Sequence, residues 1–158
     1  MGKTGPVYIG VMRVVIVAFA VLEEVLCIAA KSGIDVRIIT PKISDHWFVH
    51  IVTQSNYGDL LEAGVRIYEY TPGYVHAKTI ISDDDNAVAV SINLDYRSFY
   101  LHFENGVWIC GAPVLADIKK DILDIIAKSE EIHLEEWKAR PWHIKLAEPI
   151  LRLFSPLF

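Results

Sequence analysis

The order of hydrophobic and polar positions in the first part of the chain predicts alternating strands and helices. The β-branched run Val14–Phe19 predicts a buried strand, and Leu22–Lys31 predicts a helix that ends at Gly33. A second apolar strand is predicted at Val36–Thr40, where Pro41 stops it. A strand, a helix and a strand at this spacing form a βαβ unit, in which the two strands run parallel.

The same alternation continues over the next thirty or so residues. A helix is expected through His46–Val52, and a second one begins after Asn56, a good N-cap residue, and stops at Gly64. The apolar run Val65–Tyr70 predicts a third strand.

After Pro72-Gly73 the pattern changes to short strands. His76–Ser82 and Ala87–Asn93 are predicted strands on either side of the turn-forming Asp83-Asp84-Asp85-Asn86, which together indicate a hairpin. Glu104–Cys110 is expected to be another strand.

A long helix is then predicted at Val114–Lys128, with Pro113 at its first position. Its apolar stripe is expected to pack on the sheet and comprises Val114, Ile118, Ile122 and Ile125. The elements together predict an α/β fold, a mixed β-sheet flanked by helices. We expect a linker at residues 1–10 and a single domain over 11–158.

Composition and charge limit the class of protein and the kinds of partner that this chain can have. The chain has 158 residues, of which 53% are hydrophobic and 22% charged, typical of a globular domain with a core. The net charge of -5 argues against nucleic acid as a partner, because binding to the phosphate backbone needs clustered cations. The apolar stretch Val14–Ala30 is short for a membrane span and contains Glu23 and Glu24. Cys27 and Cys110 are expected to pack in the core.

The residues with the clearest chemistry lie in the predicted hairpin. Residues two apart on a strand point to the same face, so His76 and Lys78 emerge together, as do Ser91 and Asn93. An imidazole can attack phosphorus or protonate a leaving alkoxide, and an ammonium and an amide can hold the non-bridging oxygens. The patch suits a phosphodiester.

The spacing of these residues resembles the HKD motif of the phospholipase D superfamily. His76-x-Lys78 is followed after four residues by Asp83, and after six more and Val90 by Ser91-x-Asn93. The surrounding stretches GIDVRIITPKISDH, YTPGYVHAK, NLDYRSFYLHFEN and RPWHIKLAEPILRLFSPLF resemble cardiolipin synthases. The resemblance implies a phospholipase D-like fold, and Val90 stands where the motif usually has glycine.

The resemblance implies a role for each residue of the motif. His76 is expected to be the catalytic nucleophile or general acid. Lys78 and Asn93 are expected to bind phosphate oxygens with support from Ser91. Asp83 is expected to be the motif carboxylate, which organises the site from the end of its strand.

Glu104 resembles the carboxylate that orients the histidine and raises its basicity. The implied reaction needs no metal and no other cofactor. It joins two phosphatidylglycerols into cardiolipin and releases glycerol, through a phosphatidyl-histidine intermediate.

The resemblance implies two HKD motifs in a complete site, and this sequence holds one. We therefore expect a half-enzyme that is completed by a homodimer or by a separate N-terminal half. Two alternatives stay open, a one-motif phosphodiesterase or nuclease of the same superfamily, and an inactive truncated fragment.

The end of the chain suggests where the protein acts. Residues 137–158 mix four cations with aromatic and aliphatic side chains, which suits a segment at the surface of an anionic membrane. Packing of its apolar face on the domain is an equal alternative. With phosphatidylglycerol as the expected substrate, we expect the protein on the cytoplasmic side of a bacterial cell membrane, as a peripheral protein.

Overall fold

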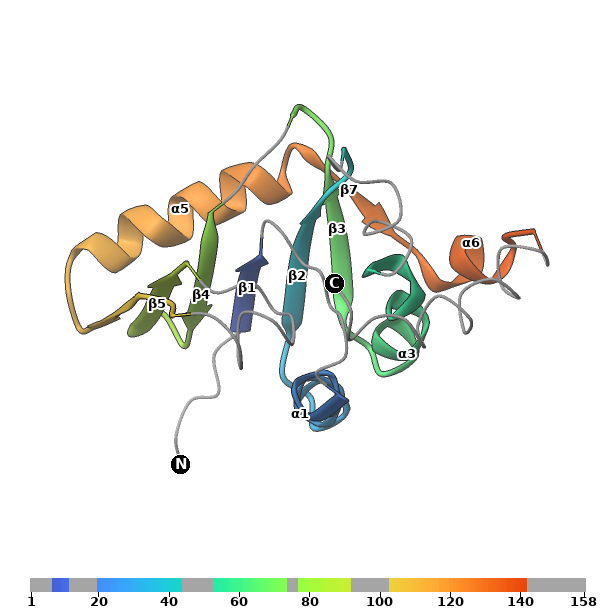
Figure 1. Cartoon of the computed structure of the whole chain (residues 1–158), viewed down its shortest axis with the longest axis horizontal. Helices are drawn as coiled ribbons and strands as arrows, with labels where there is room; N and C mark the ends of the chain where they lie inside the picture. Colours follow the sequence, from blue (N-terminus) through green and yellow to red (C-terminus); the bar gives the residue numbers. More distant parts are fainter. Residues whose placement is uncertain (1–6, 12–19, 44–52, 74–76, 92–102, 142–158) are drawn as a thin grey trace.

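The structure is a computed structural model, and it describes residues 7–11, 20–43, 53–73, 77–91 and 103–141. Seven strands form one mixed sheet in the order β6-β5-β4-β1-β2-β3-β7 (Figure 1). The strands are β1 (Val7–Val11), β2 (Val36–Pro41), β3 (Arg66–Tyr70), β4 (Lys78–Ser82), β5 (Asn86–Val90), β6 (Gly106–Cys110) and β7 (Ser129–Ile132). The helices with assigned bounds are α1 (Ala20–Lys31), α3 (Tyr57–Glu62), α5 (Val114–Ile126) and α6 (Leu134–Lys138). The predicted α/β fold is confirmed.

The predicted βαβ unit is present, but its first strand lies earlier in the chain. β1 pairs in parallel with β2, and β2 in parallel with β3, while the remaining neighbours are antiparallel. The first strand is Val7–Val11, so residues 7–10 belong to the centre of the sheet and not to a linker. The expected strand Val14–Phe19 and the expected helix His46–Val52 lie outside the described residues.

The helix ends follow the sequence signals in part. Gly33 and Gly64 have φ angles of 88° and 94°, the left-handed conformation in which glycine avoids a Cβ clash, so they end α1 and α3 as predicted. Asn56 is the N-cap residue of α3, but its side chain makes no capping hydrogen bond there. It is 2% exposed, so its amide is committed inside the domain instead.

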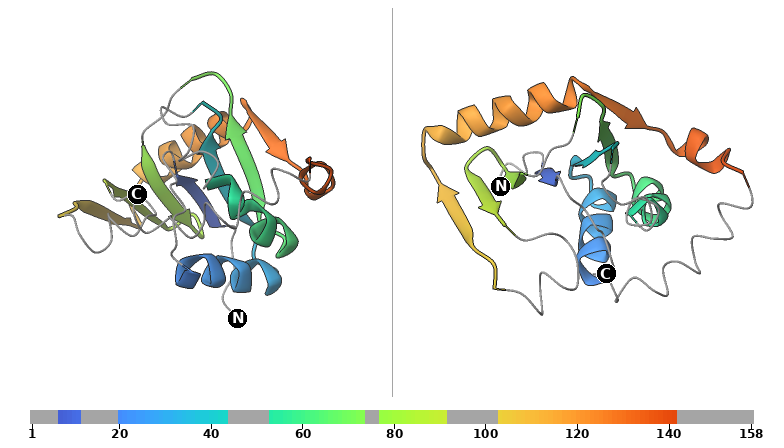
Figure 2. Two further views of the ribbon diagram at one scale, coloured as in Figure 1. Left: turned by 45° about the vertical axis from the view of Figure 1, so that its right-hand side comes forward. Right: turned by 45° about the horizontal axis from the view of Figure 1, so that its top comes forward.

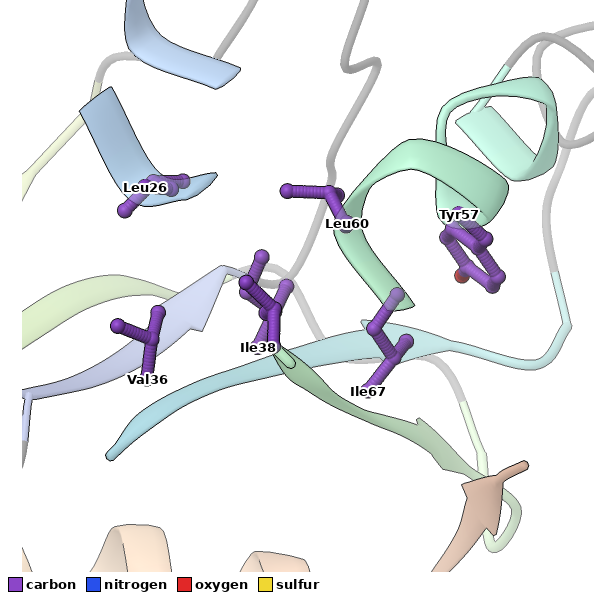
Figure 3. Close-up of a cluster of buried hydrophobic side chains, with 7 residues drawn as sticks. Leu26, Val36, Ile38, Tyr57, Leu60 and Ile67 are labelled. Carbon is purple, nitrogen blue, oxygen red and sulfur yellow. The ribbon is translucent and has the colours of Figure 1, made fainter. Parts of the chain in front are cut away.

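The first hydrophobic core fills the space between the sheet and helices α1 and α3. Figure 3 shows side chains from both helices converging on strands β2 and β3. The residues drawn and labelled are Leu26, Val36, Ile38, Tyr57, Leu60 and Ile67. The hydroxyl of Tyr57 lies 2.6 Å from Thr40 Oγ1, so the buried phenol has a hydrogen-bond partner.

Helix α5 covers the opposite face of the sheet and forms the second core. In Figure 2, α5 lies on the far side of the sheet from α1. Ile122 is buried and Ile118 and Ile125 pack against the cluster, as the stripe predicted. Val114 is 44% exposed, and Leu115 points inward at 4% exposure in its place. The register of a helix on its sheet is decided by the packing partner, and a shift of one residue fits the same periodicity.

The strand β7 and the helix α6, which follow α5 in the chain, were not predicted. β7 pairs with β3, and Arg66 bonds Glu131 across the pair through both its Nε and one Nη, at 2.9 and 3.0 Å. Its sequence Ser-Glu-Glu-Ile has two adjacent glutamates and a single apolar residue, so a hydrophobicity pattern does not reveal this edge strand. Cys27 packs against the first core as expected, whereas Cys110 ends the edge strand β6 and is exposed, which corrects the predicted core position.

Candidate functional site

Two residues of the predicted motif, Lys78 and Ser91, line an open hollow where β4 begins and β5 ends. The register pairs Lys78 with Val90, and Val90 with Gly106, so one row of residues crosses three adjacent strands. The hollow at this row has a volume of about 500 Å³. Its lining includes Ala77, Lys78, Val90, Ser91, Asn105 and Gly106. The HKD residues within the described part of the chain that line it are therefore Lys78 and Ser91.

Lys78 is buried and forms part of the wall of the hollow. It is 6% exposed, at the first position of β4. A lysine at this depth is rare in folded proteins unless polar or charged partners offset the loss of hydration. An ammonium group held in a lining wall, with little solvent around it, is suited to meet the oxygens of a phosphate.

The second polar group is a hydrogen-bonded pair, in which Ser91 lines the hollow and Glu104 lies beside it. The Ser91 hydroxyl donates a hydrogen bond to the Glu104 carboxylate, and the backbone N–H of Asn105 donates to Ser91 Oγ at 3.0 Å. The backbone N–H of Ser91 also donates to the Asn105 carbonyl, at 2.9 Å. These bonds tie the end of β5 to the residues before β6. Ser91 thereby holds the Glu104 carboxylate at the hollow, which fits a supporting role for both residues.

Asp83 lies at the other end of the hairpin. The turn places Asp83 and Asp84 in left-handed conformations, with φ angles of 55° and 63°, which aspartate tolerates better than most residues. Lys119 Nζ on α5 contacts the Asp84 carboxylate at 2.6 Å and fixes the turn. Asp83 lies five residues along the hairpin from Lys78, a separation of roughly 16 Å. Asp83 therefore fits a role in the turn and not contact with a group bound beside Lys78.

The two remaining motif residues lie outside the described residues. These are His76 and Asn93. The nearest described residues, Ala77 and Ser91, both line the hollow. The described segment 77–91 therefore begins and ends at the wall of the hollow. Within the described ranges, no group of three or more potential metal ligands comes together.

Asn105 and Gly106 line the hollow but were not predicted as site residues. Both directly follow Glu104, and the FEN stretch that identified Glu104 also contains Asn105. A steric constraint explains why glycine stands at position 106. A Cβ at this position would stand 2.8 Å from Val90 Cγ1, closer than carbon atoms approach in proteins. The unusual Val90 of the motif thus occupies the space that Gly106 leaves empty on the next strand.

We expect Val90→Gly to lower stability and to raise any activity. The loss of a half-buried side chain and the greater freedom of glycine together cost about 1 kcal/mol or more of unfolding free energy. Removing the two methyl groups from the hollow gives a substrate more room beside Lys78. Urea unfolding and turnover per chain measure the two effects, and unchanged or weaker activity would show that Val90 is no obstacle.

Gly106→Ala supplies the control for this contact. In the wild-type background the added methyl group meets Val90 Cγ1, and we expect a destabilisation of about 1–3 kcal/mol. In the Val90→Gly background the same change should cost almost nothing. Equal costs in both backgrounds would mean that the two side chains do not compete for one space.

Comparison with known families matches the cardiolipin synthase PLD-like domain over residues 8–126. This chain belongs to that family. The major cardiolipin synthase of Bacillus subtilis is 40% identical to it over 87% of this chain and 29% of that protein. A cardiolipin synthase of Geobacillus kaustophilus is 39% identical over 84% of this chain and 26% of its own length. The PLD-like chain thus spans less than a third of the length of these curated relatives.

A solved structure supports the fold of this PLD-like domain. The phospholipase D family member Nuc from Salmonella typhimurium superimposes with a TM-score of 0.69 at 17% identity. The match covers 82% of this chain and 83% of Nuc. The predicted phospholipase D-like architecture is therefore confirmed, and Nuc is a chain of comparable extent.

Proposed function

We propose that this PLD-like domain is half of a phosphatidyltransferase of the cardiolipin synthase type. The observation that carries the proposal is the hollow that joins buried Lys78 to the Ser91–Glu104 pair, directly beside the position at which the chain continues to His76. The relatives named above are cardiolipin synthases, and the matching family is the PLD-like domain of such enzymes. The substrate class is therefore an anionic glycerophospholipid, phosphatidylglycerol.

The proposed reaction has two steps at phosphorus. A ring nitrogen of His76 attacks the phosphodiester of phosphatidylglycerol, the P–N bond forms, and the P–O bond to the leaving glycerol breaks. A second histidine protonates the departing alkoxide. The hydroxyl of another phosphatidylglycerol then loses its proton to that histidine and attacks phosphorus, the P–N bond breaks, and cardiolipin is released. Lys78 and Asn93 stabilise the negative charge that develops on the non-bridging oxygens.

A second histidine is required, and we propose that a second motif supplies it. Its source is either another copy of this chain or a separate N-terminal half. Covering the hollow with a second motif would exclude water from Lys78 and Glu104 and strengthen their electrostatic effect on the transition state. A shared site between identical subunits follows the twofold symmetry that is commonest among protein dimers.

A subunit-mixing experiment tests the shared site. Wild-type chains are allowed to exchange with about a ninefold excess of His76→Ala chains, and cardiolipin formation is measured in phosphatidylglycerol vesicles. If both histidines of a dimer are needed, activity per wild-type chain should fall about tenfold, because most wild-type chains then sit in mixed dimers. Dilution with buffer to the same wild-type concentration is the reference.

Constant activity per wild-type chain across the series would contradict the shared site, as would turnover by a monomer isolated by gel filtration. Activity that appears on adding a separate N-terminal half, and not with copies of this chain, would identify the other source of the second motif.

One observation favours a second candidate function, a one-motif phosphodiesterase. Nuc matches this chain over nearly equal shares of both proteins, so a single domain of this extent also occurs without a second half in the same chain. The net charge of -5 weighs against a nucleic-acid substrate. Hydrolysis of bis-p-nitrophenyl phosphate without transfer to phosphatidylglycerol would favour this alternative.

We further propose peripheral binding to the cytoplasmic face of the cell membrane through the C-terminal segment. No helix in the described part of the chain is long and apolar enough to cross a bilayer. At the start of this segment, the ring of Trp137 lies 5.2 Å from that of Tyr57, so Trp137 packs on the domain. Membrane contact would then fall to residues 142–158, which lie outside the described residues.

A further inference from the structure

A second cavity lies between α5 and the sheet, on the far side of β4 from Lys78. It has a volume of about 150 Å³. Its walls are formed mainly by isoleucines, one from β2 and three from α5: Ile39, Ile118, Ile122 and Ile125. The other lining residues are Ala77, Thr79 and Ala89 from the sheet side and, exposed to solvent on α5, Asp121. An apolar cavity of this size gives little hydrogen bonding to water and can hold an apolar group of about six carbons.

Small residues in one row of the sheet create this space. Gly10, Thr79 and Ala89 pair across β1, β4 and β5, so they share the face that α5 covers. Ile39, which pairs with Gly10 in the same row, forms one wall, and the small side chains of Thr79 and Ala89 leave the space under α5. The cavity is therefore built by the sequence of the strands and not by a gap at a loop.

The cavity adjoins the hollow of the candidate site at the start of β4, where the two share part of their lining. Ala77, Thr79 and Ala89 line both. Thr79 directly follows Lys78, and alternate residues of a strand point to opposite faces. The end of β4 thus presents a phosphate-binding lysine on one face and the entrance to an apolar cavity on the other. A ligand with a charged head and an apolar chain, joined within a few bonds, matches this arrangement.

We propose that the cavity under α5 binds the first carbons of an acyl chain of the phospholipid whose phosphate lies beside Lys78. The inference rests on the proposed function and adds a specificity site to it. The occupant is the substrate's own chain because the cavity shares its wall with the phosphate hollow and is lined by aliphatic groups. The domain then selects diacyl phosphodiesters over the deacylated head group.

Binding of two ligands that differ by their acyl chains tests this site. The probes are dihexanoyl phosphatidylglycerol, kept monomeric, and glycerophosphoglycerol, which carries the same head group without acyl chains. Each buried methylene contributes roughly fourfold in affinity, so the diacyl ligand should bind wild type at least about 60-fold more tightly if three are buried. Ile118→Phe fills the cavity from α5 and should reduce this preference at least about tenfold, with unchanged affinity for glycerophosphoglycerol.

The matched control is Ile126→Phe, on the same helix and against the same core but not lining the cavity. It should keep the preference of wild type. Ile125→Phe fills the cavity from about two turns further along α5 and repeats the test if Ile118→Phe does not fold. Retention of the preference in both filled variants, or equal binding of both ligands by wild type, overturns the acyl site and leaves the proposed function intact. Failure of wild type to bind either ligand counts against the proposed function itself, and the acyl site falls with it.

Discussion

His76→Ala should lower phosphatidyl transfer by at least about a thousandfold. The imidazole is the proposed nucleophile or its partner acid, and no histidine in the described part of the chain lines the hollow to take its place. Loss of a nucleophile or of a general acid commonly costs between about a hundredfold and a millionfold. The measurement is the initial rate of cardiolipin formation from labelled phosphatidylglycerol vesicles.

The control for this variant is His133→Ala. His133 is exposed and precedes α6, next to β7, which forms the edge of the sheet opposite to β6. It should retain the rate of wild type. More than a few per cent activity in purified His76→Ala, with circular dichroism like that of wild type, would exclude His76 as the catalytic histidine.

Lys78→Met should reduce turnover by about a hundredfold or more. Methionine keeps an unbranched side chain of similar length in the buried position and removes the positive charge. Removing one preorganised group that stabilises transition-state charge typically costs about 10²–10³ in rate. If the lysine acts mainly on the developing charge, kcat should fall more than KM rises.

Lys128→Met is the matched control, because Lys128 is exposed and lies beyond the C-terminal end of α5. It should leave kcat unchanged. Urea unfolding of both variants separates a loss of charge from a loss of fold, since a buried lysine also contributes to packing. Near wild-type kcat in a folded Lys78→Met variant would limit Lys78 to a structural role.

Part of this fold could be predicted from local sequence signals. Gly33 and Gly64 mark helix ends because their left-handed conformations are accessible to glycine at no steric cost. The aspartate-rich turn predicts the β4–β5 hairpin for a related reason, and the ladder Lys78 to Ser82 against Asn86 to Val90 is present. The polar candidates Lys78 and Ser91 were identified from spacing along the chain, and both line the hollow.

Other features depend on partners that are distant in sequence. Strand β1 was not predicted, because Val7–Val11 is a short run interrupted by Gly10, and its place at the centre of the sheet comes from pairing with β2 and β4. The inward position of Leu115 in place of Val114 is set by how α5 lies on the sheet. Strand β7 exists through its pairing with β3, since its own sequence is largely polar.

The sequence by itself determined the family, the parallel core and the residues that we propose for phosphate chemistry, because spacing and periodicity are local properties of the chain. The tertiary structure decided where the described ones among those residues lie. It buries Lys78, joins Ser91 to Glu104, and moves Asp83 to the far end of the hairpin. It also opens an apolar cavity beside the hollow, because side chains from β2, β4, β5 and α5 meet there only after the helix packs on the sheet.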